Sequence, residues 1–599
     1  MAGPRLELMW PHKDEFLLVP RDDDGKPVWV APDHPAAREV RLSRFTGSIG
    51  TVDETDPHLD NTVFVGDSFD AMRVMCEVPE FAERYRGKVK LIYADPPFNT
   101  GQTFQHYDDW MEHATWLSFM RDRLNQMRDL LAPAGSVWIH LDDVEAHRMR
   151  CLLDEVFGAE NFVATVVWQK VTSPRNDTTG FSTSQDYILV YRRSSTWAPN
   201  RMERLASSNT SRYKSRDGDP VPWRDGDATA GKAATNHPMV YAIQHPVTGG
   251  LMYPTPGRCW GKAQTWFLDQ MNHYAKYELR DIGDEERRAT ICGTTPSKVK
   301  QGVPAIMLAE PLADAATSAR SRHKAGLWPE LVFLDIEKER VQRKKHLEDN
   351  GRVPETLWLA AEVGGSLRGK NQVRALFPEA HAFATPKPEE LLQRIIHIGS
   401  SPGDIVFDPF AGSGTTAAVA HKMGRRWATS ELSLDTVKQF VVPRLTKVVE
   451  GTDPGGITDS VGWGGGGGFR SVAIEPSLYE VGVEGMVFLR DDVDADDLAR
   501  AMAGQMRFTY LPDATPFCGQ RGRMLLAVVP GAVGTEEVDD LISQLPEGSR
   551  LTLAAGALMP GAADYLAKSS RGSKALKIPR DVLTRSLRRA TDDDLGAQS

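Results

Sequence analysis

The feature that most constrains this fold is an alternation of short apolar runs with amphipathic helices in residues 61–169. The runs NTVFVGDSF, VKLIYADPP and SVWIHLDD each end at a polar corner, and helical spacing fills the intervals between them. The same rhythm returns in residues 387–433 as helix, strand, glycine-rich turn, helix and strand. Strands that alternate with helices pair in parallel, so the sequence predicts an α/β sheet covered by helices on both faces.

A length of 599 residues exceeds what one ordinary core organises, so several units are expected. We expect a long polar insertion where the strand rhythm fades, and a separate unit after the glycine-rich GWGGGGGFR. The predicted division is an N-terminal extension, a first half of the α/β domain, the insertion, a second half, and a glycine-rich joint with a small C-terminal α/β domain: 1–60, 61–169, 170–380, 381–462 and 463–599.

Charge is distributed unevenly along the chain. The net charge is −10, yet residues 170–370 contain 30 Lys and Arg against 23 Asp and Glu, a local charge of +7. A basic insertion favours contact with phosphates. Five scattered cysteines without a Cys-x-x-Cys pair argue against disulfides and a zinc site, and no run is long and apolar enough for a membrane span. These features predict a cytoplasmic protein without a membrane contact or a metal.

The stretch FDPFAGSGTT, residues 407–416, places glycines where a strand turns into a helix. Gly412 and Gly414 allow the backbone to approach a ligand closely, with helix N-terminal amides behind them. The stretch lacks the lysine of a Walker A loop and the third glycine of a dinucleotide fingerprint. Glu431, at the end of the next strand, suits a ribose diol, and Asp408 can meet a cationic amino group. These requirements fit S-adenosylmethionine.

The motifs ADPPFNTG and DPFAGSGTT, in this order and separated by a long insertion, resemble the β-class amino-group DNA methyltransferases, especially the modification subunits of type III restriction systems. TWLSFMRDRL, HLDDVEAHRMRCLLDEVFGAENFVATVVW and TPKPEELLQRII extend the resemblance. It implies a Rossmann-like S-adenosylmethionine-dependent sheet that is circularly permuted, with a target-recognition insertion. It also implies methyl transfer to the N6 amino group of adenine in duplex DNA, within restriction-modification or another phage defence.

Residues 95–98 suit that chemistry. The lone pair of an exocyclic amine is delocalised into the ring, and acceptors for both amine hydrogens favour a pyramidal, nucleophilic nitrogen. Asp95 can supply a carboxylate oxygen and Pro96 its carbonyl, while Pro96 and Pro97 restrict the backbone. Phe98 offers a stacking face for a base that must be flipped out of the duplex.

The resemblance implies further roles for single residues. Lys387, with Thr385 beside it, matches a position that helps bind the methionine end of the cofactor, and Phe410 belongs to the cofactor loop. The family more often has Tyr at the position of Phe98, so the stacking face is kept and a hydroxyl is lost. Asp95 favours adenine, since relatives that methylate cytosine at N4 typically have Ser there.

Other functions remain open. The chemistry alone permits N4 of cytosine, and a cofactor-fold DNA-binding protein that acts only with a partner subunit is a second alternative. Methyltransferases for RNA or for protein glutamine usually have Asn-Pro-Pro, which Asp95 disfavours.

Basic and aromatic side chains alternate in the insertion, and the run EKERVQRKKH, residues 337–346, is helical in propensity. The predicted contacts to double-stranded DNA are Arg175, Arg192, Arg193, Lys214, Arg340, Arg343, Lys344 and Lys345. The resemblance also implies a homodimer and a separate restriction or defence subunit.

Overall fold

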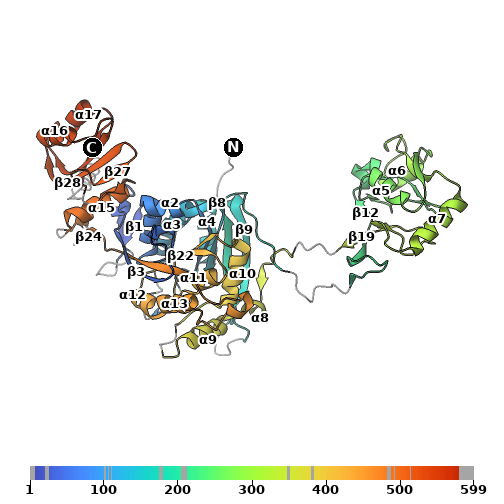
Figure 1. The fold of residues 1–599 in the computed structure, drawn as a ribbon, viewed down its shortest axis with the longest axis horizontal. Helices are drawn as coiled ribbons and strands as arrows, with labels where there is room; N and C mark the ends of the chain where they lie inside the picture. Colours follow the sequence, from blue (N-terminus) through green and yellow to red (C-terminus); the bar gives the residue numbers. More distant parts are fainter. Residues whose placement is uncertain are drawn as a thin grey trace. The chain divides into compact units, whose positions relative to one another are not determined.

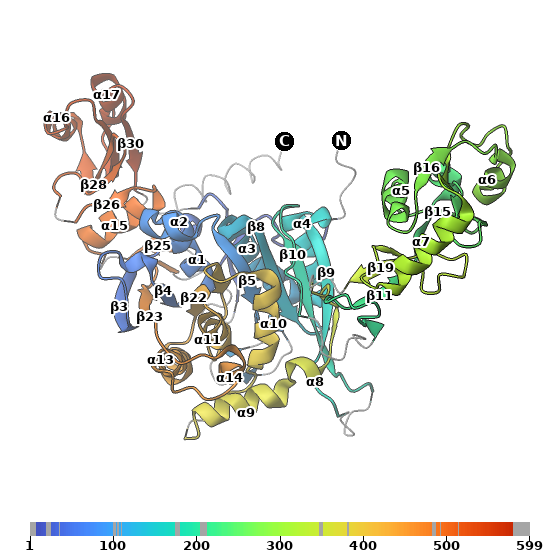
Figure 2. The same cartoon turned by 45° about the vertical axis from the view of Figure 1, so that its right-hand side comes forward.

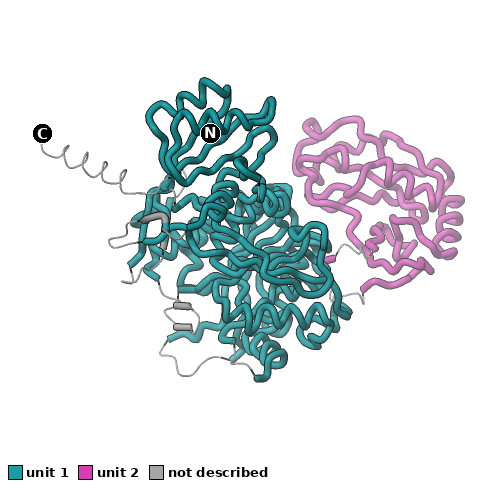
Figure 3. Tube along the Cα trace, turned by 60° about the vertical axis from the view of Figure 1, so that its left-hand side comes forward, with its two compact units in different colours: residues 1–202, 353–599 teal, residues 203–352 magenta. Residues whose placement is uncertain are grey.

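The computed structural model describes residues 7–578, apart from 20–25, 35, 100–102, 105–106, 109–110, 174–179, 204–211, 347–350, 380–382, 482–486, 491–492 and 513. The chain forms two compact units, coloured teal and magenta in Figure 3. Unit 1 contains residues 1–202 and 353–599, and unit 2 contains residues 203–352.

A ten-stranded sheet organises unit 1, in the order β20-β9-β10-β8-β5-β21-β22-β4-β23-β3. The six neighbours from β8 to β23 run in parallel, while β10 and β3 are antiparallel to theirs. The sheet therefore confirms the predicted Rossmann-like, permuted α/β architecture. Its strands are β3 (Ser43–Gly50), β4 (Asn61–Val65), β5 (Val89–Ala94), β8 (Leu131–Leu141), β9 (Phe162–Gln169), β10 (Gln185–Arg192), β20 (Leu357–Trp358), β21 (Ile405–Asp408), β22 (Arg426–Glu431) and β23 (Gly468–Ile474).

Helices cover both faces of this sheet (Figures 1 and 2). Alternate residues of β5 show why its sequence is apolar throughout: Ile92 packs in the core of one layer, and Leu91 and Tyr93 pack in the core of the other. The first layer contains α1 (Ser68–Glu77), α3 (His113–Leu130) and α4 (Ala146–Phe157); the second contains α10 (Glu389–Gly399), α11 (Thr415–Lys422) and α13 (Val442–Glu450).

The C-terminal part of unit 1 has its own five-stranded sheet, in the order β26-β27-β28-β29-β30. Strands β28, β29 and β30 are parallel, and two helices form the crossovers between them, which confirms the predicted small α/β domain. The elements are α15 (Ala495–Gln505), β26 (Thr509–Tyr510), β27 (Gly519–Arg521), β28 (Met524–Val533), α16 (Thr535–Ser543), β29 (Arg550–Leu558), α17 (Ala562–Ser569) and β30 (Lys574–Lys577).

Three of the predicted regions need new bounds. The compact insertion is residues 203–352, narrower than 170–380, because β10 pairs with both β8 and β9 inside the main sheet. Strand β3 of the expected N-terminal extension and strand β23 of the expected C-terminal region also belong to that sheet. The glycine-rich joint is a tight turn into β23: a Cβ on Gly468 would lie 2.4 Å from the carbonyl oxygen of Thr51.

Unit 2 contains a three-stranded sheet, β11-β19-β18, and a four-stranded sheet, β14-β13-β17-β16. The prediction of a helix over residues 337–346 is wrong, because β19 pairs with β11 on one side and β18 on the other, and this pairing outweighs helix propensity. The elements used below are β11 (Trp223–Gly226), β18 (Leu331–Val332) and β19 (Gln342–His346). Within the described ranges, no helix has the length and apolar character needed to cross a membrane.

Candidate active site at the carboxyl ends of the parallel strands

Four neighbouring parallel strands end in acidic corners. Strands β5, β21, β22 and β4 lie side by side, and their carboxyl ends lead to Asp95, Asp408, Glu431 and Asp67. Phe407 pairs with Ile92, so the strands that carry the two sequence motifs are neighbours. The four acidic residues line one cavity of about 790 Å³, which is the size of a small-molecule site.

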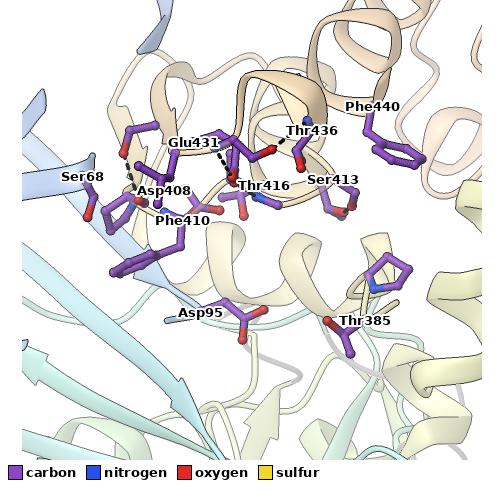
Figure 4. Close-up of a pocket in the computed structure, with 18 of the residues that line it drawn as sticks. Ser68, Asp95, Thr385, Asp408, Phe410, Ser413, Thr416, Glu431, Thr436 and Phe440 are labelled. Carbon is purple, nitrogen blue, oxygen red and sulfur yellow. Dashed lines mark hydrogen bonds between the residues drawn. The ribbon is translucent and has the colours of Figure 1, made fainter. Parts of the chain in front are cut away.

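Most residues predicted to act in catalysis or cofactor binding line this cavity. Pro96, Phe98 and Gly414 do not line it themselves, although each adjoins a residue that does. In Figure 4, Asp95 and Thr385 lie on one side of the cavity, and Asp408 at the end of β21 and Thr416 in α11 lie on the other. The lining set includes Asp95, Pro97, Thr385, Lys387, Asp408, Phe410, Gly412 and Glu431.

The two carboxylate oxygens of Asp95 have different surroundings. Oδ2 contacts the ammonium group of Lys387, whose nitrogen also lies 5.3 Å from the ring centroid of Phe98. Oδ1 is buried and has no hydrogen-bond partner among the residues that the structure describes. A buried acceptor without a partner is costly, so Oδ1 suits a ligand that brings an N–H donor into the cavity.

Two side chains that the sequence reasoning missed hold the corner after Asp95. Trp116 Nε1 donates to the carbonyl oxygen of Pro97 at 2.9 Å. Asn99 has a left-handed backbone, with φ of +62°, which Asn tolerates better than most residues. Its Oδ1 accepts from Met111 N at 2.7 Å, and its Nδ2 donates to buried Glu145 at 2.8 Å. The corner is therefore preorganised, and the polar Asn directly after Phe98 was the available sequence signal.

The glycine-rich loop has the close-approach geometry that its sequence predicts. Gly412 and Gly414 have φ of +53° and +76°, and a Cβ on Gly412 would lie 3.3 Å from the ring of Phe383. Glu431 accepts from Gly412 N at 2.9 Å and from Ser433 N at 3.0 Å. These bonds fix Glu431 beside the loop, and a carboxylate retains acceptor capacity for a ligand hydroxyl.

A buried ionic cluster supports the loop from behind. Lys422 contacts Glu389 at 2.9 Å and Asp453 at 2.6 Å, and Arg444 Nη2 donates to Glu389 at 2.8 Å. Arg444 Nη1 donates to Thr415 Oγ1 at 2.7 Å, at the start of α11. Two basic and two acidic groups balance one another, so the loop has a rigid base.

The carboxyl group of Asp408 is strongly perturbed. Burial raises its pKa to about 7, and the nearby charges of Asp95 and Glu431 add to the rise. Hydrogen bonds from Thr416 and from Phe410 N oppose it. A cationic ligand group would lower the raised pKa of Asp408 again, so the cavity suits a ligand with a positive charge near this carboxyl group.

Sequence reasoning also missed the β4 wall of the cavity. Asp67 and Ser68 line it, and Arg123 holds both, with Nη2 at 2.6 Å from Asp67 and Nε at 2.9 Å from Ser68 Oγ. The signal was the polar corner VGDSF at the end of a predicted strand. Phe383 and Phe440 add an apolar wall, with ring centroids 5.3 Å apart.

The structure buries one of the predicted DNA contacts and places two others away from the cavity. Lys344 is buried against Asp217 and Asp219, at 2.7 Å from each, because its side chain points to the inner face of β19. Arg192 pairs with Ser136, and Arg193 N donates to the carbonyl oxygen of Gly135. Since β10 is antiparallel to β8, Arg192 and Arg193 lie at the opposite end of the strands from the cavity.

The remaining predicted contacts have mixed outcomes. Arg175 lies outside the described residues, and Lys214 and Arg340 are exposed in unit 2. Arg343 and Lys345 alternate with Lys344 along β19, so they share its outer face with Arg224, which pairs directly with Lys345. We name Arg224, Arg343 and Lys345 the basic face of unit 2.

Comparison with known proteins shows a similarity to DNA methylases. The model of a DNA methylase family matches residues 89–248 and 328–441. The HindVI Mod subunit described for a type III system of Haemophilus influenzae is 28% identical over 460 residues, covering 73% of this chain and 57% of that protein. The type III StyLTI Mod subunit of Salmonella typhimurium is 26% identical over 388 residues, covering 60% and 49%.

A third relative matches over a shorter segment at higher identity. The DNA adenine methyltransferase YhdJ of Escherichia coli is 47% identical over 77 residues, covering 13% of this chain and 26% of that protein. The chain spans about half the length of the two Mod subunits that it matches. Together with the cavity at the strand ends, these matches show that residues 89–248 and 328–441 of this chain are similar to DNA methylases.

Proposed function

We propose that this protein transfers a methyl group from S-adenosylmethionine to the N6 amino group of adenine in duplex DNA, at a specific sequence. The observation that carries the proposal is the meeting of the Asp95–Phe98 corner and the glycine-rich loop around one cavity. The name of the YhdJ relative supports adenine as the base, as does Asp95 at the head of the corner.

The residues present fit the cofactor. Asp408 would face its cationic amino group, Glu431 its ribose hydroxyls, and Thr385 and Lys387 its methionine end. When bound, the cofactor supplies an electrophilic methyl group. Phe383, Phe410 and Phe440 would shield the reaction from water, since all three line the cavity.

The corner would activate the amine by accepting its hydrogens. Oδ1 of Asp95, for which the described residues offer no partner, and the carbonyl of Pro96 would be the acceptors, and Phe98 would stack on the flipped base. The nitrogen lone pair would form the new N–C bond as the methyl group leaves the sulfur, which would keep the bonding electron pair, and the nitrogen would then release one proton to water. Preorganised acceptors stabilise the positive charge that develops on the nitrogen.

Unit 2 would contribute to DNA binding. Its basic face offers three cationic side chains to phosphates, and such contacts add affinity without reading sequence. The Mod relatives are named as subunits of type III systems, so we also propose a homodimer and a separate restriction or defence subunit.

The test is single-molecule sequencing of DNA from cells that express the wild-type chain or Asp95→Ala. We expect N6-methyladenine at one sequence motif with the wild type and none with the variant. N4-methylcytosine at a motif would show that the substrate is cytosine and not adenine. Unmodified DNA from both strains would contradict methyltransferase activity of this chain alone and would favour a DNA-binding protein that needs a partner.

A further inference from the structure

A chain of polar side chains, all buried except the half-buried Lys170, crosses the sheet beside the Asp95–Phe98 corner. The hydroxyl of Tyr93 lies 2.8 Å from His140 Nδ1, and His140 Nε2 lies 3.3 Å from Asp186 Oδ2. Lys170 Nζ donates to Asp186 Oδ1 at 2.6 Å. The four residues come from β5, β8, β10 and the residue after β9. We name this set the His140 relay.

The relay fixes the orientation of the imidazole. His140 is fully buried, and both of its ring nitrogens have a side-chain partner. The ring of Trp168 packs edge-on against the imidazole, with 5.4 Å between the centroids and 88° between the planes, and confines the imidazole further. Burial opposes ionisation of Asp186, but contacts with His140 and Lys170 outweigh it and lower its pKa. A buried and satisfied network of this kind holds one geometry.

The imidazole also stacks on Phe98. The two ring centroids are 5.9 Å apart, with 25° between the planes. Tyr93, whose hydroxyl contacts the imidazole, lines the cavity itself. The relay therefore joins the ring of Phe98 to three strands of the rigid sheet.

We propose that His140 is a positioning residue for methyl transfer: held by Tyr93 and Asp186, its ring sets the plane of Phe98. This inference rests on the proposed function, in which Phe98 is the platform for the flipped base. A small misplacement of a reacting group can lower a rate by about 100-fold. A lone hydrophobic side chain would fill the same space without needing two partners, so the relay serves orientation more than packing.

The experiment measures transfer of tritiated methyl groups from S-adenosylmethionine to DNA from a bacterial strain without this enzyme. His140→Leu removes the ring, and Asp186→Asn keeps the shape but weakens the hold on it. We expect kcat to fall by about 10- to 100-fold for His140→Leu and less for Asp186→Asn. Cofactor affinity, measured by calorimetry, should stay within about twofold because the relay lies beside the base platform.

Ser136→Ala is the matched control. Ser136 lies on the same strand β8, is equally buried, and accepts from Trp138 Nε1 at 3.0 Å, with no contact to Phe98. We expect this variant to unfold at lower temperature with unchanged kcat. A loss of kcat in the control as large as in His140→Leu would overturn the positioning role in favour of a general packing effect.

A double-mutant cycle with Phe98→Ala isolates the mechanism. If His140 acts through Phe98, His140→Leu should lower the rate less than about twofold in the Phe98→Ala background. Multiplicative losses would overturn the inference, as would wild-type kcat in both relay variants. DNA left unmethylated by the wild-type chain would instead contradict the proposed function, and the positioning role with it.

Discussion

Two lysine–aspartate contacts, one in each unit, have opposite surroundings. In unit 2, Lys344 and Asp217 are 2% and 0% exposed, and Asp219 gives the ammonium group a second partner. In unit 1, Lys387 and Asp95 are 10% and 21% exposed and line the cavity. Within the described part of the chain, Asp95 Oδ1 has no hydrogen-bond partner. The same pair of residue types therefore forms a closed structural contact in one place and an open contact in the other.

The difference shows how a site is distinguished from a core. In unit 2 the acceptors are used up: Asp217 also accepts from Trp223 Nε1 at 2.8 Å and from Trp328 N at 2.7 Å. Burial opposes ionisation of Asp217, but these bonds and Lys344 outweigh it and lower its pKa. In unit 1 the cavity keeps one acceptor available to a ligand. Unsatisfied capacity beside a cavity, more than charge, marks the functional pair.

The largest effect is expected from a substitution at the open contact between Asp95 and Lys387. Asp95→Asn keeps the shape of the side chain but replaces the carboxylate by an amide, which is a weaker acceptor for the amine. We expect kcat for methyl transfer to fall by about 100- to 1,000-fold, as when one preorganised group is removed from other active sites. The thermal unfolding midpoint serves as the control, and a large drop in it would point to misfolding.

Breaking the closed contact should have the complementary result. Lys344→Met leaves Asp217 and Asp219 without their cation, and loss of one partner from a buried pair costs about 3 kcal/mol. We expect earlier urea unfolding and faster proteolysis in residues 203–352. Calorimetric affinity for S-adenosylmethionine should not change, and a weaker affinity would contradict the separation of the two contacts.

The pH dependence of the affinity for S-adenosylmethionine tests whether the charge of Asp408 contributes to cofactor binding in unit 1. Burial raises the pKa of this carboxyl to about 7, so below pH 7 it is protonated and lacks the charge that attracts a cationic amino group. We expect the dissociation constant to rise by about tenfold from pH 8 to pH 6. Asp408→Asn should bind more weakly and flatten the profile, and an unaltered slope in that variant would assign the titration to another group.

The smallest expected effect concerns the outer face of the strand that holds Lys344. Lys345→Ala removes one cation from the basic face, so the salt dependence of DNA affinity should lose about one unit of slope without a change of sequence preference. Lys324→Ala, on a helix of the same unit, is the charge-matched control. Equal losses in both variants would indicate a diffuse charge effect and argue against the basic face.

Sequence alone predicted much of unit 1. The apolar runs ending in ADPP and FDPF, with glycines after the second, predict parallel strands that bring Asp95 and Asp408 to one edge of a sheet. These features depend on local pattern and on the limited ways in which parallel strands connect. The same reasoning failed for residues 337–346, where a charged run with helical propensity forms β19.

What the sequence determined by itself is therefore the type of sheet, the two motifs and the chemistry that they suit. Only the tertiary structure decided that Lys344 is buried, that Arg192 and Arg193 lie away from the cavity, and that His140 stacks on Phe98. The physical reason is that burial, strand direction and ring contact arise between segments distant in the chain. No local pattern of residues encodes them.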